Sequence, residues 1–155
     1  MTDAAPRTPR ETIEGTAVSA LLAHRFPFLL IDRIDIVQPG RRVIGRKLIT
    51  VGEWWNEGTH GPAAIFPFSL VIEAMAQTSA GLMRDLVAGA EGAVAYFMGV
   101  TRVRLRHAAR PGDQLAMELT LQQWRRGLCR AHGVATVDDR LVASADLTTI
   151  VRRGA

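Results

Sequence analysis

Residues 67–89 of the chain read PFSLVIEAMAQTSAGLMRDLVAG, and this stretch decides the fold. Pro67 suits the first turn of a helix, because that turn needs no backbone amide donor, and Gly89 is a typical helix stop. At about 1.5 Å per residue the predicted helix is a rod of roughly 33 Å. Its first part is apolar almost all the way round, which indicates a helix that other elements cover on most sides. The apolar residues are Leu70, Val71, Ile72, Ala74, Met75 and Ala76.

The segments around this helix predict strands that can cover it. In residues 114–122, which read QLAMELTLQ, apolar and polar residues alternate with a period of two, as in a strand with one buried face. Other stretches are rich in β-formers and are separated by turn residues; they are residues 29–37, 42–51, 93–106, 128–137 and 141–151. The pattern predicts an α+β fold, in which one long central helix is wrapped by an antiparallel sheet.

Length and composition favour a single domain. The 155 residues are enough for one hydrophobic core, which we place in residues 16–155, and the polar residues 1–15 are predicted to be a mobile tail. No segment has the features of a secretory signal or the roughly 18 consecutive apolar residues of a membrane span. We therefore expect a cytoplasmic protein without membrane contact. Cys129 is the only cysteine, which rules out an internal disulfide, and we expect it to be a small filler residue.

The net charge of +4 favours an anionic partner. The chain has no recognition-helix pattern, no aromatic stacking platform and no run of five or more basic residues, so nucleic acid is not the expected partner. An acidic protein or an anionic cofactor arm fits the charge better.

Four motifs follow one another along the chain. They are LLAHRFPFLLIDRI (21–34), VIEAMAQ (71–77), YFMGV (96–100) and RPGDQLAMELTLQQWRRGLCRAHGVATVDD (110–139). Together they resemble the 3-hydroxyacyl-acyl carrier protein dehydratases of fatty-acid synthesis. The resemblance implies a hotdog fold, with the long helix as the sausage, and a dimer whose two sheets join at an edge strand.

The resemblance also implies a site. In that family a histidine in the loop before the helix and a glutamate on the helix, from different subunits, remove water from a (3R)-hydroxyacyl thioester. The glutamate matches Glu73. A carboxyl group on an apolar helix face favours its protonated form and can act as an acid near neutral pH, although stabilisation by the helix dipole is the alternative role. Gln77, one turn later, is predicted either to orient the carboxyl group or the thioester, or to make a core hydrogen bond.

The loop before the helix departs from the family. The family pattern there is Gly-His-Phe-Pro-Gly, whereas this chain reads NEGTHGPAAIFPFSL. With Glu53, Pro67 and Glu73 in register, Thr59 takes the histidine position and His60 follows it. A shift of one residue in extended chain turns a side chain to the opposite face, although a local rearrangement of the loop could restore it. We assign His60 as the proton acceptor and expect Thr59 beside the substrate.

Further substrate-binding residues follow from the same resemblance. Phe68 stands where the family has a glycine that approaches the thioester, and its side chain should narrow the acyl tunnel. Phe66, Pro67 and Ser69 surround it, and the free amides at this helix start are expected to polarise the thioester carbonyl. Trp55 is predicted either to line the tunnel or to pack at a dimer contact.

Basic residues after the helix are candidates for docking the carrier protein. They alternate along a predicted strand and into the following turn, which is typical either of a solvated face or of a surface for an acidic carrier protein; they are Arg102, Arg104, Arg106 and Arg110. Among the histidines, His24 is expected to pack or to bond the backbone. His107 and His132 are expected to be solvated or packed.

The leading functional prediction is a dehydratase that acts on (3R)-hydroxyacyl-acyl carrier protein thioesters, as a homodimer or higher homo-oligomer. Because Thr59 takes the histidine position, a non-catalytic or half-site subunit that forms a heterodimer with a competent homologue is an alternative. An acyl thioesterase on the same scaffold is another alternative. None of these reactions implies a metal or a redox cofactor.

Overall fold

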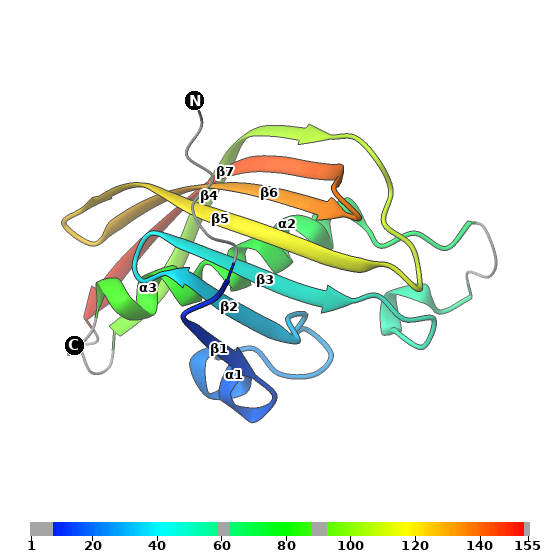
Figure 1. The fold of residues 1–155 in the computed structure, drawn as a ribbon, viewed down its shortest axis with the longest axis horizontal. Helices are drawn as coiled ribbons and strands as arrows, with labels where there is room; N and C mark the ends of the chain where they lie inside the picture. The colour runs from blue at the N-terminus through cyan, green and yellow to red at the C-terminus, as the bar shows by residue number, and fades with distance from the viewer. Residues whose placement is uncertain (1–7, 59–62, 88–92, 154–155) are drawn as a thin grey trace.

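The computed structural model describes residues 8–58, 63–87 and 93–153. A seven-stranded antiparallel sheet curves around two consecutive helices, α2 and α3 (Figure 1). The strand order is β1-β2-β3-β5-β6-β7-β4. The strands are β1 (Glu11–Glu14), β2 (Arg33–Gln38), β3 (Arg42–Leu48), β4 (Ala93–Leu105), β5 (Gln114–Arg125), β6 (Leu128–Val137) and β7 (Arg140–Arg153). The helices are α1 (Thr16–Leu21), the short 3-10 helix η1 (Trp54–Asn56), α2 (Phe68–Thr78) and α3 (Ala80–Leu86).

The long central helix is confirmed, with an interruption at Ser79. The amide of Ser79 donates to the carbonyls of both Met75 and Ala76, and its hydroxyl donates to the Ala76 carbonyl at 2.6 Å. Such back-bonding by serine competes with the regular helical pattern, so the helix divides into α2 and α3 at this residue. Helical hydrogen bonding resumes directly after it, because the amides of Leu82 and Met83 donate to the Ser79 carbonyl. The predicted stop, Gly89, lies outside the described residues.

The segment predicted to be a tail contains strand β1. Glu11–Glu14 pairs antiparallel with β2, and the Thr12 hydroxyl donates to the Asp35 carboxylate at 3.1 Å. Both carboxylate oxygens of Glu11 accept from the Arg84 guanidinium of α3 at 2.7 Å. Residues 11–14 therefore belong to the sheet, and the sequence pattern missed them because the strand is short and mostly exposed.

The core lies between α2 and the inner face of the sheet. Leu115, Met117 and Leu119 of β5 are fully buried, which confirms the strand predicted from their alternation. They belong to the same cluster as Val71 and Met75 of α2. The α+β hotdog arrangement is confirmed. None of the helices in the described residues is long and apolar enough to span a membrane.

Strand β4 forms one edge of the sheet, and within the described part of the chain only β7 pairs with it. Most of its residues are exposed, including Tyr96, Phe97 and Met98. The β4–β7 register shifts between Thr101 and Arg104, so the predicted alternation of basic residues along one face is wrong at this point. A bulge inserts an extra residue here and changes which face the following side chains occupy.

Candidate active site

Glu73 lies on the side of α2 that the sheet does not fully cover. Its neighbours Val71, Ala74 and Met75 are buried, whereas the Glu73 side chain is 27% exposed. The expected dry environment is therefore only partly present, because this side of the helix faces a surface cleft. Water therefore has access to the carboxyl group.

Gln77 fixes the position of this carboxyl group. Its amide oxygen accepts from the backbone amide of Leu30 at 2.9 Å, and its amide nitrogen donates to the Phe28 carbonyl at 2.8 Å. These two partners determine which end of the side-chain amide is the nitrogen. The same nitrogen donates to Glu73 Oε1 at 2.8 Å. Gln77 thus makes core hydrogen bonds and contacts the Glu73 carboxyl group at once, and its role toward a thioester stays a prediction.

The segment that Gln77 holds also brings a histidine to the site. His24 Nε2 lies 3.4 Å from Glu73 Oε1, and the His24 ring lies 6.2 Å from the Phe28 ring. The Arg25 guanidinium donates to the carbonyls of Leu22 and His24, both at 2.7 Å. The sequence prediction of a packing role missed this contact, because 49 residues separate the two partners in the chain.

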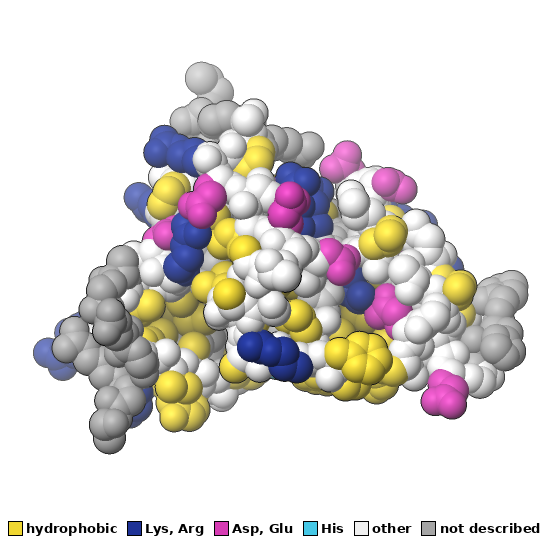
Figure 2. Space-filling model, turned by 90° about the horizontal axis from the view of Figure 1, so that it is seen from below, with side chains coloured by type: hydrophobic (Ala, Val, Ile, Leu, Met, Phe, Trp, Pro, Cys, Tyr) yellow, Lys and Arg dark blue, Asp and Glu magenta, His cyan; other side chains and the backbone are white. Residues whose placement is uncertain are grey.

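A cleft with a volume of about 500 Å³ opens beside Glu73. Glu73, Gln77 and His24 line it, together with residues of α3 and residues 93–97 of β4. The exposed edge strand is thus part of the cleft wall. Figure 2 shows the molecule from the end where β1 and α1 lie in Figure 1. On this face hydrophobic side chains reach the surface in several patches.

Of the other predicted substrate residues, those that the structure describes do not line this cleft. Phe66 is buried and packs edge to face against Trp55, with ring centroids 5.4 Å apart. Phe68 is half-buried against the core, and Pro67 caps α2 without a side-chain hydrogen bond. Ser69 is exposed in the first turn of α2. Phe66 and Trp55 therefore anchor the loop before α2 by packing within the chain, whereas Trp55 was predicted to line the tunnel or to pack at a dimer contact.

Glu53 holds that loop, a role that the sequence did not indicate. Its carboxylate accepts from the Thr50 amide, the Trp55 indole and the Lys47 ammonium, each at 2.9 Å. The Lys47 ammonium also lies 5.5 Å from the centre of the Phe66 ring. A largely buried acid with three donors ties the loop to the end of β3, because such a group is stable only when it is paired.

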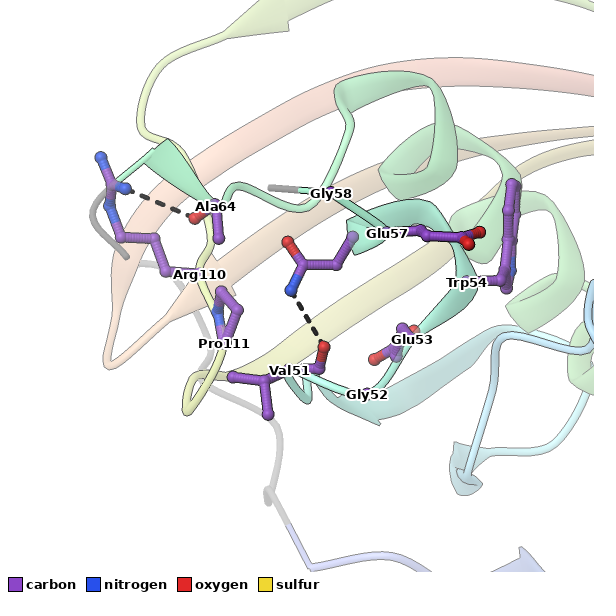
Figure 3. A pocket seen from close by; sticks show the side chains of 10 residues that line it. Val51, Gly52, Glu53, Trp54, Glu57, Gly58, Ala64, Arg110 and Pro111 are labelled. Carbon is purple, nitrogen blue, oxygen red and sulfur yellow. Dashed lines mark hydrogen bonds between the residues drawn. The ribbon is translucent and has the colours of Figure 1, made fainter. Parts of the chain in front are cut away.

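A larger cavity, of about 790 Å³, lies next to the loop that Glu53 holds (Figure 3). It lies between the segment 51–58 on one side and Ala64, Arg110 and Pro111 on the other. The Asn56 side-chain amide donates to the Val51 carbonyl at 2.9 Å, and the Arg110 guanidinium donates to the Ala64 carbonyl at 3.4 Å. Thr59 and His60 lie outside the described residues, so their predicted roles stay predictions.

A second histidine cluster lies across β4, β6 and β7. His132 Nδ1 is 2.6 Å from Asp146 Oδ1, and the Arg102 guanidinium forms an ion pair with the same carboxylate. Burial raises the pKa of Asp146, but His132 and Arg102 outweigh it and hold that pKa below its usual range. His132 thus has a partner that its sequence context did not reveal. None of the three residues lines the Glu73 cleft.

Fold and site together define a hotdog-fold protein with a carboxyl group on its central helix, facing a cleft beside the edge strand. The chain belongs to the FabA-like family, since the model of the FabA-like domain matches residues 22–146.

Similar proteins carry the name of a dehydratase. A 3-hydroxyacyl-[acyl-carrier-protein] dehydratase FabZ from Roseiflexus sp. (strain RS-1) is 42% identical over 130 residues, which cover 84% of this chain and 90% of the relative. The protein of that name from Syntrophotalea carbinolica is 40% identical over 139 residues, which cover 90% of this chain and 95% of the relative.

Solved structures establish the fold. The dehydratase heterocomplex ApeI:P from Xenorhabdus doucetiae contains a chain that is similar with a TM-score of 0.72 at 19% identity, covering 87% of this chain and 90% of that chain. A hypothetical thioesterase with coenzyme A from Streptococcus pneumoniae TIGR4 has a TM-score of 0.57 at 12% identity, covering 75% and 82%. At these identities the likeness extends to the fold alone.

Proposed function

We propose that the chain is a 3-hydroxyacyl-acyl carrier protein dehydratase, a lyase that converts (3R)-hydroxyacyl thioesters to trans-2-enoyl thioesters in fatty-acid or polyketide-type biosynthesis. One observation carries the proposal. Glu73, held by Gln77, faces a cleft of about 500 Å³ in a chain that is 42% identical to a FabZ dehydratase.

The proposed reaction is an elimination beside a thioester. Glu73 gives a proton to the 3-hydroxyl group as the C3–O bond breaks, and water leaves. His60 takes the proton from C2, and the electron pair of that C–H bond forms the C2=C3 double bond. The amides of Phe68 and Ser69, which precede the first helical donors Leu70 and Val71, polarise the thioester carbonyl.

A second subunit is part of this proposal. Part of the cleft wall is an edge strand with exposed apolar side chains, so a subunit that pairs along β4 would stand next to the cleft. A homodimer is the simplest arrangement. The half-site alternative is a heterodimer with a competent homologue, and Thr59 at the histidine position favours it; a dehydratase heterocomplex is known for the similar fold ApeI:P.

Replacing Glu73 tests the acid role directly. Glu73→Gln keeps the size of the side chain and its hydrogen bonds but removes the ionisable proton, so turnover of a 3-hydroxyacyl carrier substrate to the enoyl product should fall by about 100-fold or more. Glu14→Gln, on the exposed face of β1, is the matched control and should leave turnover unchanged. Wild-type activity in the Glu73→Gln variant would remove the carboxyl group from the mechanism.

The same assay separates the alternatives. Turnover by the purified chain alone supports the homo-oligomeric dehydratase. Turnover that appears only after a homologous subunit is added supports the half-site heterodimer. Release of free thiol from an acyl thioester, without enoyl product, supports a thioesterase.

A further inference from the structure

The two oxygens of the Glu73 carboxyl group have different surroundings. Oε1 accepts from the Gln77 amide at 2.8 Å and also lies 3.4 Å from His24 Nε2. Both protein partners therefore approach one oxygen, and no hydrogen bond from a described residue reaches Oε2. A carboxyl group held in this way presents one defined oxygen to a substrate.

The His24 ring has only one polar partner among the described residues. Nδ1 is buried and makes no hydrogen bond there, while Nε2 points toward Glu73. A buried polar atom without a partner is uncommon in a folded protein and is costly, so it calls for a functional reason. The side chain is 39% exposed and lines the Glu73 cleft, so it is part of the site rather than of the core.

We propose that His24 is a positioning residue for Glu73, an inference that rests on the proposed dehydration. After Glu73 has given its proton to the departing hydroxyl group it is a carboxylate. The Nε2–H of His24 then donates to Oε1 beside the Gln77 amide, and these two donors stabilise the negative charge as it forms. The C2 proton still goes to the base from the loop before α2, so His24 changes no bond of the substrate.

The distance of 3.4 Å fits this role. It exceeds the usual hydrogen-bond range of about 2.7–3.2 Å, as is common for catalytic groups before the substrate is bound. The other titratable or charged groups nearby are few. Among the described residues that line the cleft only Tyr96 of β4 can also titrate, and the Arg25 guanidinium is taken up by two backbone carbonyls. Neither replaces His24 as a donor to Oε1.

Two substitutions at His24 separate positioning from packing. His24→Phe keeps a ring beside Phe28 but removes the donor, and it should lower kcat by about 10- to 100-fold with KM within about twofold, the effect of losing a hydrogen bond to a charge. His24→Gln loses the ring but offers an amide donor, and it should retain kcat within about fivefold. A packing role gives the opposite order, with His24→Phe active and His24→Gln impaired, and this result would overturn the proposal. His107→Gln, at an exposed histidine, is the matched control.

A measurement that needs no catalytic turnover tests the contact between His24 and Glu73 independently of the proposed dehydration. In protein labelled with ¹⁵N-histidine, the signals that His24→Phe removes identify His24 among the four histidines. We expect the Nε2–H tautomer, with nitrogen shifts that change in Glu73→Gln. The Nδ1–H tautomer, or shifts insensitive to Glu73→Gln, would exclude the contact whatever reaction the chain catalyses. If the contact is present but no dehydration occurs in any variant, the proposed function fails and the His24 role in dehydration fails with it.

Discussion

Gln77 connects the fold to the site through a single side chain. Gln77→Met keeps the volume but leaves the Leu30 amide and the Phe28 carbonyl without their partner. An unpaired buried group costs about 1–3 kcal/mol, and the Phe28 carbonyl is only partly buried and costs less, so the free energy of unfolding should fall by about 2–4 kcal/mol. Urea denaturation measures it. Gln123→Met, at an exposed position of β5, is the control and should change the value by less than about 0.5 kcal/mol.

Asp35 should make stability depend on acid pH. Burial raises the pKa of this carboxyl group, but hydrogen bonds from Arg46, Arg33 and Thr12 outweigh it and lower the pKa overall. A lowered pKa means that the ionised form is favoured in the folded state. The resulting stability is complete above the unfolded value of about 3.9 and is lost as pH falls through the folded pKa.

Asp35→Asn tests this dependence. At neutral pH the variant should be less stable by about 1–3 kcal/mol, because the two arginines lose a charged acceptor. The difference from wild type should narrow as pH falls below about 4. Urea denaturation across this range measures it, with Asp138→Asn in the exposed turn after β6 as control. A difference that stays constant down to about pH 2 would contradict the pairing.

At the residue scale, the sequence was sufficient to predict a contact that depends on spacing along one helix. Glu73 and Gln77 stand one helical turn apart, and the structure places them in contact. His24 and the partners of Gln77 come from a segment almost fifty residues earlier, and no local pattern indicates such a contact. Phe68 was predicted to affect the tunnel on the basis of one aligned position. Its packing against the core depends on the whole loop, which alignment does not describe.

Helix α2 approaches strand β3 closely at Gly45. A Cβ atom built there would overlap the Thr78 side chain, including its Cβ at 2.9 Å, which belongs to the end of α2 and cannot rotate away. Gly45→Ala should therefore cost about 1–3 kcal/mol of unfolding free energy, by overpacking. In the double variant Gly45→Ala/Thr78→Ala part of this loss should be recovered, since Oγ1 and Cγ2 are removed.

Gly133 of β6 offers the matched control. A Cβ atom there would meet first the end of the Met75 side chain, which is flexible and can move. Gly133→Ala should destabilise the protein less than Gly45→Ala in the same urea denaturation. Equal losses would show that the distance between α2 and β3 is adjustable.

At the element scale, periodicity was sufficient for the long strands and the central helix. The strand predicted at residues 128–137 has the same limits in the structure. Strand β1 and the interruption at Ser79 were missed, because one depends on pairing with β2 and the other on a single hydroxyl group. The strand order, with β4 at the edge beside β7, follows from long-range pairing, which the sequence indicated only through the family resemblance.

In the whole molecule, the outer edge of β4 has no partner strand among the described residues, and this predicts a dimer. Met98 is 62% exposed in this strand, and it does not line the Glu73 cleft. Met98→Lys places a charge where two copies of β4 would meet, so sedimentation equilibrium should show a dimer for wild type and a shift toward monomer for the variant. Leu48→Lys, at the exposed end of β3, is the control and should stay dimeric. Monomeric wild-type protein would remove the subunit interface from the proposed site.

Docking of the carrier protein is the other property of the whole molecule. The chain carries a net charge of +4, and Arg104 and Arg106 are exposed at the end of β4, away from the ion pair that holds Arg102. Acyl carrier proteins are acidic, so the double variant Arg104→Glu/Arg106→Glu should raise KM for the carrier-bound substrate by about tenfold or more, with kcat little changed. The effect should shrink as salt is added, because screening weakens exposed charges.

A control with the same change in charge separates docking from the general field of the protein. Arg125 and Arg126 are exposed at the turn between β5 and β6, and neither lines a described cavity. If the carrier docks at the end of β4, Arg125→Glu/Arg126→Glu should change KM much less than the variant at residues 104 and 106. A short thioester without the carrier protein should be turned over equally by both variants, since its binding needs no docking surface. Equal rises in KM for both variants would mean that the carrier responds to net charge alone, and no surface of β4 would then be assigned to it.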